Sequence, residues 1–84
     1  MKPVTVYTTD MCPYCSSAKA LLGKRGVEYE EINLARDPDA RKLLRERTGM
    51  STFPQILIDG TPIGGFDQLL AADRAGRLPG LLAA

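Results

Sequence analysis

The sequence predicts an α/β fold in which a four-stranded mixed sheet is flanked by three or more helices. Its apolar and turn-forming residues indicate the element order strand, helix, strand, helix, hairpin, helix. A strand–helix–strand start favours two parallel strands joined by a right-handed crossover, and the hairpin adds an antiparallel pair to the same sheet. With 84 residues, we expect a single domain, residues 1–84, built on one modest core.

The first strand is expected over Val4–Thr8, because this segment is β-branched and aromatic and contains neither glycine nor proline. After a turn, a helix begins at Pro13. Its apolar residues recur at helical spacing, as Ala18, Leu21 and Leu22. Gly23 and Gly26 close this segment. Cys12 therefore falls at the N-terminus of the helix.

The second strand is expected over Val27–Asn33, although its polar and apolar residues do not alternate cleanly. A second helix follows, because Asp37 is a suitable cap and Pro38 suits the first helical position. This charged helix carries a narrow apolar stripe, formed by Leu43 and Leu44. It is expected to end near Gly49.

A β-hairpin is expected from strands at residues 55–58 and 61–64, with Asp59 and Gly60 forming a tight turn. Pro62 cannot donate a backbone hydrogen bond, so its strand is expected at the edge of the sheet.

The third helix is expected over Phe66–Ala75, with Gly76 just beyond its end. Its apolar side is formed by Leu69, Leu70 and Ala72. A short apolar tail follows, with no regular structure assigned; it contains Leu78, Leu81 and Leu82. Together these elements predict an α/β sandwich in the thioredoxin style.

Charge and hydropathy argue against two classes of partner. The formal net charge is +1 and no long run of one sign occurs, so no nucleic acid partner is expected. No apolar stretch approaches the roughly 20 residues that span a bilayer, and the first residues lead into a strand rather than a signal-peptide core. We therefore expect a soluble, cytoplasmic protein without a membrane partner.

The two cysteines, Cys12 and Cys15, are the strongest indication of chemistry. A disulfide between them closes a loop too short to stabilise a fold appreciably. The chain has no histidine, so it cannot supply the usual four ligands of a structural zinc site, and no metal is expected. A metal would have to be shared between chains or with a small thiol. An isolated C-x-x-C pair instead favours redox chemistry.

The expected roles of the two thiols differ. Unpaired N–H groups and the helix dipole stabilise an anion at Cys12, so its pKa is expected to be lowered and its thiolate to be the nucleophile. A low pKa also makes Cys12 a better leaving group. Cys15 lies on the same helix face, close enough to form a disulfide, and is expected to be the resolving thiol. Its alternative is a small buried core residue.

Three groups of residues resemble motifs of the glutaredoxin family, in the glutaredoxin order. They are Cys12-Pro13-Tyr14-Cys15 followed by Ala18-Lys19 and Leu21-Leu22, then Thr52-Phe53-Pro54, then Gly64-Gly65-Phe66-Asp67. The resemblance covers nearly the whole chain and is to the dithiol type, whereas thioredoxins usually carry C-G-P-C. It implies a thioredoxin-like fold and a glutathione-dependent thiol–disulfide oxidoreductase with glutathione as co-substrate.

The same resemblance implies a glutathione-binding set. Pro54 would be a cis-proline facing the active site, so that the backbone of Phe53 pairs with an incoming peptide-like thiol. Gly65 would allow close backbone approach, and Asp67 would bind the ammonium group of the γ-glutamyl end. Arg41 matches a basic position that reaches the glycine carboxylate, or else is a solvated arginine. The full set is Tyr14, Arg41, Thr52, Phe53, Pro54, Gly65, Phe66 and Asp67.

Other positions are interpreted more narrowly. Tyr14 either shapes the glutathione cleft or packs beside the motif. Lys19 is interpreted as a helix residue with a packed stem and is left out of the catalytic set. Thr9 replaces a lysine found in many relatives, which removes a positive charge near Cys12. Phe66 replaces a common third cysteine, which leaves the mechanism intact.

The resulting hypothesis is reduction of glutathione mixed disulfides and protein disulfides by Cys12, with Cys15 resolving the protein intermediates. Expected partners are glutathione, glutathionylated or disulfide-containing proteins and, indirectly, glutathione reductase; the chain is expected to be a monomer. One alternative is an electron donor, as for ribonucleotide reductase, reduced by thioredoxin reductase. Another is a module that shares a glutathione-ligated iron–sulfur cluster between two chains, although such modules usually carry C-G-F-S.

Overall fold

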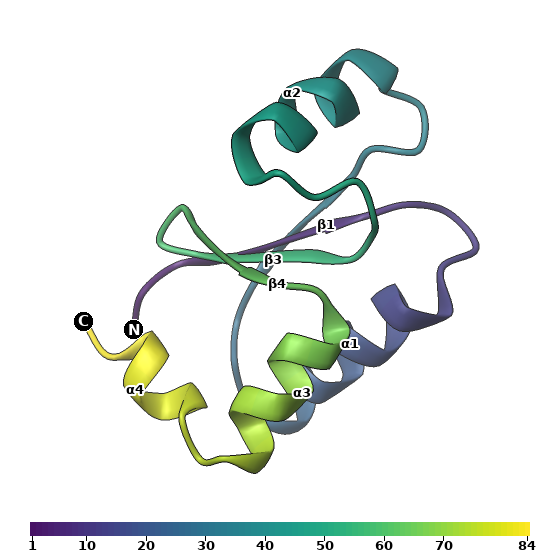
Figure 1. Ribbon diagram of the computed structural model, residues 1–84. Helices are drawn as coiled ribbons and strands as arrows, with labels where there is room; N and C mark the ends of the chain where they lie inside the picture. Colours follow the sequence, from purple (N-terminus) through teal and green to yellow (C-terminus); the bar gives the residue numbers. More distant parts are fainter.

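The chain folds around one four-stranded sheet (Figure 1). The computed structural model describes all residues, 1–84. The elements in order are β1 (Val4–Thr8), α1 (Pro13–Lys24), β2 (Glu30–Asn33), α2 (Pro38–Thr48), β3 (Gln55–Ile58), β4 (Thr61–Gly64), α3 (Phe66–Arg74) and α4 (Leu78–Leu82). The strand order is β2-β1-β3-β4, with β1 parallel to β2 and antiparallel to β3. The expected α/β fold with a mixed sheet is confirmed, and β4 lies at the edge as its proline predicted.

The two faces of the sheet are covered unequally. Figure 1 shows α2 on one face and α1, α3 and α4 on the other. Strand β1 alternates between buried and half-buried residues, whereas every residue of β3 is buried because helices cover both of its faces. The pairing of Val6 with Ile56 and of Val4 with Ile58 directs these four side chains toward the face that carries α1 and α3.

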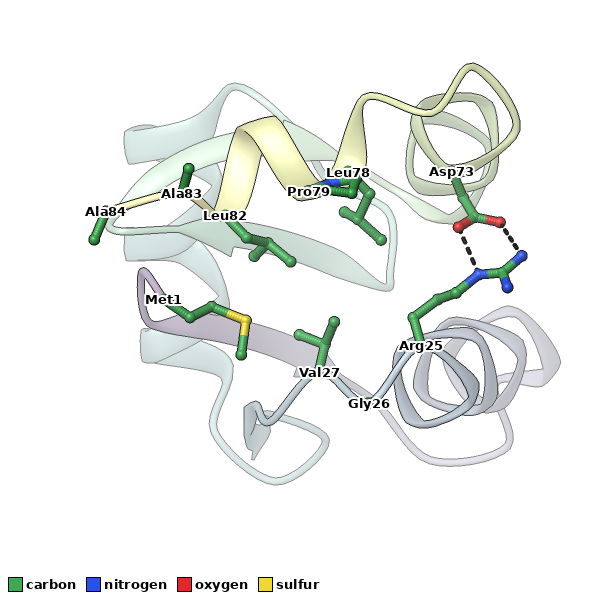
Figure 2. A pocket seen from close by; sticks show the side chains of 10 residues that line it. All are labelled: Met1, Arg25, Gly26, Val27, Asp73, Leu78, Pro79, Leu82, Ala83 and Ala84. Atoms are coloured by element: carbon green, nitrogen blue, oxygen red, sulfur yellow. Dashed lines mark hydrogen bonds and ion pairs between the residues drawn. The ribbon is translucent and has the colours of Figure 1, made fainter.

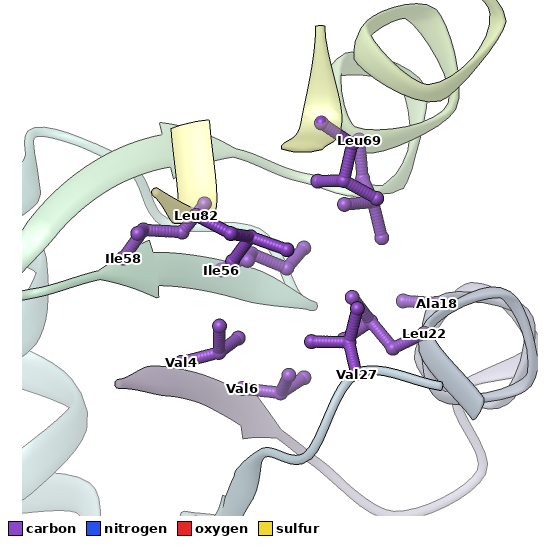
Figure 3. Close-up of a cluster of buried hydrophobic side chains, with 10 residues drawn as sticks. Val4, Val6, Ala18, Leu22, Val27, Ile56, Ile58, Leu69 and Leu82 are labelled. Atoms are coloured by element: carbon purple, nitrogen blue, oxygen red, sulfur yellow. The ribbon is translucent and has the colours of Figure 1, made fainter. Parts of the chain in front are cut away.

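A core of ten buried apolar residues fills the space between the sheet and these three helices (Figure 3). Its members are Val4, Val6, Ala18, Leu22, Val27, Ile56, Ile58, Leu69, Leu78 and Leu82. Leu22 of α1 and Leu69 of α3 are 1% and 0% exposed, so each helix contributes at least one fully buried leucine. Burial of such a side chain stabilises the fold by about 1.5–3 kcal/mol.

Local signals account for the element ends that were predicted correctly. The Asp37 side chain accepts a hydrogen bond of 3.0 Å from the N–H of Ala40, and α2 ends at Gly49 in the left-handed conformation (φ 75°). The hairpin turn has positive φ at both Asp59 (50°) and Gly60 (78°), as a two-residue turn between twisted strands requires.

One predicted boundary was wrong. The second strand begins at Glu30 rather than Val27; Val27 is instead a buried loop residue whose N–H donates to Leu22 O at 2.9 Å. Strand β2 pairs with β1 only over four residues, so packing against the core, not sheet pairing, holds Val27. The first helix ends at Lys24, between the two glycines predicted to close it, and Gly26 has a positive φ (69°) just beyond its end.

The apolar tail is a short helix, α4, which the sequence analysis missed. Leu78 and Leu82 lie one turn apart and are both buried in the core, so tertiary packing stabilises a helix too short to form alone. The carbonyl of Leu82 accepts a hydrogen bond of 2.8 Å from Lys2 N–H, which joins the two ends of the chain. None of the four helices is long and apolar enough to cross a bilayer.

An ion pair connects α3 to the end of α1. The Arg25 guanidinium donates two hydrogen bonds to the Asp73 carboxylate, Nε to Oδ1 at 2.8 Å and Nη2 to Oδ2 at 2.9 Å. Figure 2 shows this pair at one end of a hollow that extends along α4 to the chain ends. The hydrogen bonds from Arg25 hold the pKa of Asp73 below its ordinary value of 3.8.

Replacement of Leu69 by alanine is expected to lower the free energy of unfolding by about 2–5 kcal/mol, because it leaves a cavity in the middle of the core. Leu43→Ala is the matched control, since Leu43 is also helical but 65% exposed. Its effect should stay within about 0.5 kcal/mol. Denaturant unfolding measures both, and equal effects would contradict the assigned core.

Stability is also expected to depend on Asp73 at acid pH. A carboxyl whose pKa is lower in the folded than in the unfolded chain contributes stability above the unfolded pKa and loses it as the pH falls through the folded pKa. Asp73→Asn should therefore lower the free energy of unfolding at pH 7. Below about pH 4, the free energy of unfolding of this variant should fall less with decreasing pH than that of the original protein. Denaturant unfolding from pH 7 to pH 2 measures this, with Asp59→Asn as the control that keeps the acid dependence.

Candidate active site at the start of α1

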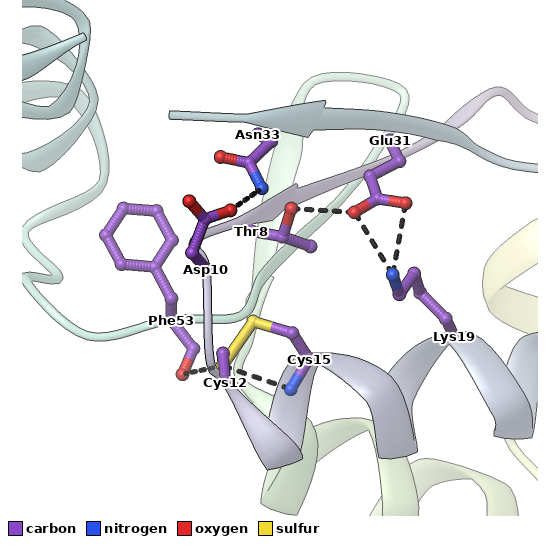
Figure 4. The surroundings of a disulfide bond; sticks show 8 residues. All are labelled: Thr8, Asp10, Cys12, Cys15, Lys19, Glu31, Asn33 and Phe53. Atoms are coloured by element: carbon purple, nitrogen blue, oxygen red, sulfur yellow. Dashed lines mark hydrogen bonds and ion pairs between the residues drawn. A yellow bond between two sulfur atoms is a disulfide. The ribbon is translucent and has the colours of Figure 1, made fainter. Parts of the chain in front are cut away.

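The two cysteines lie in the first turn of α1. Cys12 is the N-cap residue and Pro13, which has no N–H to satisfy, is the first residue of the helix. The Cys12 sulfur accepts a hydrogen bond of 3.2 Å from Cys15 N–H and is joined to the Cys15 sulfur in a disulfide (Figure 4). The Cα atoms are 5.2 Å apart, within the usual range for a disulfide.

The two sulfurs differ in access. Cys15 is 3% exposed, while Cys12 is half-buried and follows Met11, which is fully exposed in a left-handed turn (φ 52°). After reduction, Cys12 is therefore the thiol that a substrate can reach. Its position at the helix N-terminus also suits a thiolate, because N–H groups of the first turn and the helix dipole stabilise negative charge there.

The sheet register brings two other segments to the same end of the sheet. Gln55 at the start of β3 pairs with Tyr7 near the end of β1, and Gly64 at the end of β4 pairs with Ile56. The loop before β3 and the start of α3 therefore lie beside the segment that follows β1, which carries Cys12.

The loop before β3 approaches Cys12 directly. The carbonyl oxygen of Phe53 lies 3.7 Å from the Cys12 sulfur, and the peptide bond between Phe53 and Pro54 is cis, as expected. A Cβ atom on Gly65 would lie only 3.3 Å from the carbonyl oxygen of Pro54. Glycine at position 65 thus permits the close approach of this loop to the start of α3.

A groove of about 450 Å³ lies between this loop and the start of α3. Its lining residues are Tyr14, Met50, Thr52, Phe53, Pro54, Gly65, Phe66, Asp67 and Gln68. The Tyr14 ring, 63% exposed, stacks on Phe66 with centroids 6.1 Å apart, so the two rings form one wall. Seven of the eight residues predicted for glutathione binding meet here, the exception being Arg41; Met50 and Gln68 were not predicted.

The start of α3 presents two opposite charges to the groove. No side chain at the N-cap position occupies the N–H groups of its first turn, so this end of the helix attracts an anion. Asp67 lies in the same turn and is exposed, so its carboxylate attracts a cation. The Gly65 N–H is bound by Gln68 Oε1 at 2.8 Å, which orders the turn.

Arg41 lies outside this groove. It lines a neighbouring hollow that shares Met50 and Phe53 with the groove. Its Nη1 donates to the carbonyl oxygens of Leu34 (2.6 Å) and Ala35 (2.8 Å), so it holds the connection between β2 and α2. Arg41 is therefore neither in the groove nor a freely solvated arginine.

A second hollow, lined by polar residues, lies on another side of the disulfide. Its lining residues are Thr9, Asp10, Met11, Cys12, Pro13, Cys15, Ser16, Lys19, Glu31 and Asn33. Here the Glu31 carboxylate accepts a hydrogen bond of 2.8 Å from Thr8 Oγ1 and pairs with Lys19 Nζ at 3.2 Å (Figure 4). The hydrogen bond from Thr8 and the pairing with Lys19 hold the pKa of Glu31 below its ordinary value. Sequence analysis missed this network, because residues 8 and 31 meet only through the pairing of β1 with β2.

Comparisons with known proteins agree with this geometry. The family model described as Glutaredoxin matches residues 4–63. A Pseudomonas aeruginosa protein named Glutaredoxin is 48% identical over 84 residues, covering 100% of both chains. Glutaredoxin 3 of Escherichia coli is 44% identical over 82 residues, covering 98% of this chain and 99% of its own.

Solved structures give the same result. The crystal structure of a buckwheat glutaredoxin–glutathione complex superposes with a TM-score of 0.88 at 33% identity, covering 96% of this chain and 76% of that chain. The solution structure of glutaredoxin from Brucella melitensis has a TM-score of 0.87 at 45% identity, covering 98% of this chain and 89% of that chain.

Proposed function

The chain belongs to the glutaredoxin family, and from that premise we propose that it reduces glutathione mixed disulfides and protein disulfides with glutathione as its reductant. Its redox-active cysteine pair makes it a thiol–disulfide oxidoreductase of this family. The finer assignment, to glutathione, is supported above all by one feature. That feature is a groove next to Cys12 which carries an anion site and a carboxylate on the same helical turn.

The groove suits the γ-glutamyl end of glutathione. That end carries one ammonium and one carboxylate on a single carbon atom. Asp67 would bind the ammonium, and the free N–H groups at the start of α3 would bind the carboxylate. The buckwheat relative was solved in complex with glutathione, which supports the same ligand for this chain.

The rest of the groove suits the remaining part of the tripeptide. The backbone of Thr52 and Phe53 would pair with the cysteinyl residue in β fashion, which directs its sulfur toward Cys12. Pro54 would close the groove beneath it, and the stacked rings of Tyr14 and Phe66 would form the apolar wall.

Arg41 would act on the glycine carboxylate from the adjoining hollow. Only its Nη1 atom is used by the backbone carbonyls, so its other donors are available. Lys42 and Arg45 line the same hollow and add to its positive potential. Together they would attract the carboxylate that extends past Phe53.

The reaction on a glutathione mixed disulfide has two steps. The Cys12 thiolate attacks the glutathione sulfur, the target thiol leaves and takes a proton, and Cys12 is left joined to glutathione. A second glutathione thiolate then attacks that sulfur, releases oxidised glutathione and regenerates the Cys12 thiolate. In sum, the mixed disulfide and one free glutathione become the target thiol and one molecule of oxidised glutathione, and Cys12 returns to its starting state.

A protein disulfide is reduced by a different second step. The Cys12 thiolate attacks one sulfur of the target disulfide and forms a mixed disulfide with it, while the bond between the two target sulfurs breaks and the other sulfur leaves as a thiolate that takes up a proton. Cys15 then attacks the Cys12 sulfur, which releases the target thiol and forms the Cys12–Cys15 disulfide seen in the structure. Two glutathione molecules then return the pair to the dithiol and leave as oxidised glutathione, which glutathione reductase reduces. We propose that the chain does this as a single monomeric domain, residues 1–84, in the cytoplasm.

The decisive experiment follows NADPH consumption by the oxidised protein. We expect turnover with glutathione plus glutathione reductase and none with thioredoxin reductase alone. Cys12→Ser should abolish turnover on a glutathione mixed disulfide, whereas Cys15→Ser should retain it and lose reduction of a protein disulfide. Turnover only with thioredoxin reductase would show that glutathione is not the reductant. Full activity of Cys12→Ser would exclude Cys12 as the nucleophile.

Asp67→Asn tests the groove itself. Loss of a charge-assisted hydrogen bond weakens binding by about 1.5–3 kcal/mol, so the KM for a glutathione mixed disulfide should rise about tenfold or more while kcat changes little. Asp59→Asn, in the hairpin turn away from the groove, is the control and should keep the original KM. An unchanged KM in Asp67→Asn would mean that glutathione does not bind here as described.

A further inference from the structure

The polar network beside the disulfide has no part in the reaction described so far. Thr8 is 1% exposed, and its hydroxyl donates to Glu31 Oε2 at 2.8 Å. Lys19 Nζ lies 3.2 Å from both oxygens of the same carboxylate. A buried hydroxyl, a carboxylate and an ammonium group are thus held together next to a pair of redox-active sulfurs (Figure 4).

The network is closer to the buried thiol than to the substrate groove. Lys19 lies four residues after Cys15 on α1, so the two side chains are neighbours on one helix face. Side chains on a helix lean toward its N-terminus, which directs the Lys19 stem over the turn that carries Cys15. Lys19 and Glu31 line the hollow that both cysteines border, and neither lines the groove that holds Tyr14 and Asp67. Within this hollow it is the helical spacing that brings Lys19 to Cys15.

We propose that the Lys19–Glu31 ion pair, oriented by Thr8, sets the ionisation of the reduced Cys15 thiol and thereby the rate at which Cys15 resolves a mixed disulfide held on Cys12. The inference rests on the proposed function only for its protein-disulfide branch. Lys19 and Glu31 are positioning residues in this scheme: they act through Cys15 and touch neither substrate nor the reacting sulfur of Cys12.

The resolving step explains why such a device is needed. Cys15 attacks as a thiolate, but burial of its sulfur at 3% exposure favours the neutral thiol. The proton of Cys15 has to leave through the hollow to solvent before the attack. Cys15 then forms a bond to the Cys12 sulfur, the bond from Cys12 to the target sulfur breaks, and the released target thiolate takes up a proton.

The two charges of the pair act on this thiol in opposite directions. The Lys19 ammonium stabilises a Cys15 thiolate, and the Glu31 carboxylate opposes it. The other charged group facing the hollow is Asp10, from the turn before α1, whose carboxylate is held by Asn33 Nδ2 at 3.0 Å and Arg36 Nη2 at 3.3 Å. Asp10 is held by groups outside α1, whereas Lys19 lies on the same helix face as Cys15. The Lys19–Glu31 pair is therefore the charge that we assign to Cys15.

The test measures the pKa of Cys15 in the Cys12→Ser variant, where Cys15 is the only thiol and serine retains an N-cap oxygen. The readout is the pH dependence of the alkylation rate with iodoacetamide. Lys19→Met should raise the pKa by about one unit, and Glu31→Gln should lower it by about one unit, because each leaves the other charge unbalanced. The double variant should return close to the starting value.

Opposite signs separate this role from a structural one. A pair that only supports the fold would shift the Cys15 pKa in the same direction in both variants, through increased exposure, and that result would overturn the proposal. Unchanged pKa values in both would overturn it too. Lys24→Met and Glu30→Gln are matched controls, on the last turn of α1 and on the other face of β2, and should have no effect.

A second measurement keeps the proposal testable if one variant folds poorly. Single-turnover formation of the Cys12–Cys15 disulfide from a mixed disulfide should become about threefold faster in Glu31→Gln and about threefold slower in Lys19→Gln at neutral pH. A shift of one pKa unit changes the fraction of Cys15 present as thiolate about tenfold, and the opposite change in the nucleophilicity of that thiolate lowers the net effect on the rate to about threefold. The alkylation experiment contains no glutathione, so its outcome is independent of whether glutathione is the reductant in the NADPH assay.

Discussion

The position of Cys12 at the N-cap of α1 is the constraint on which the rest of the structure depends. A sulfur at this position can accept the Cys15 N–H and, when reduced, be stabilised as a thiolate by the helix terminus. Any group that contacts the Cys12 sulfur therefore has to lie beside the first turn of α1. Cys12 lies at the end of the sheet because it follows β1 after a short turn, and α1 begins at the next residue, Pro13. Cys15, one turn into the helix, is buried.

Sheet topology assembles the groove around that point. Because β3 is antiparallel to β1 and β4 is antiparallel to β3, the residues before β3 and after β4 return to the end where β1 stops. Phe53 and Pro54 precede β3, and Gly65 to Asp67 follow β4, so segments far apart in the chain meet beside Cys12. Core residues of α1, β3 and α3 pack together and so hold these segments in place relative to Cys12. The geometry of the groove therefore depends on the stability of the core.

Two different surroundings flank the cysteine pair. The groove near Cys12 combines the stacked rings of Tyr14 and Phe66 with the turn that carries Asp67, and the proposed binding of glutathione rests on these features. The hollow on the other side of the cysteine pair contains the Lys19–Glu31 ion pair, whose carboxylate is also bound by the buried Thr8 hydroxyl. The disulfide thus lies between a recognition groove on one side and a polar network on the other, although its two cysteines share one helical turn.

The sequence by itself determined the elements whose signals are local: β1, the capped start of α2, the two-residue hairpin turn and the placement of Cys12 at a helix N-terminus. These depend on residues within a few positions of one another. Resemblance to a family added the groove residues. Only the tertiary structure decided that Val27 leaves the second strand, that the tail folds as α4, that Arg41 binds the carbonyls of Leu34 and Ala35, and that Thr8 and Lys19 meet Glu31. Each of these depends on packing or pairing between separate elements, and no local pattern of residue types encodes which elements will become neighbours.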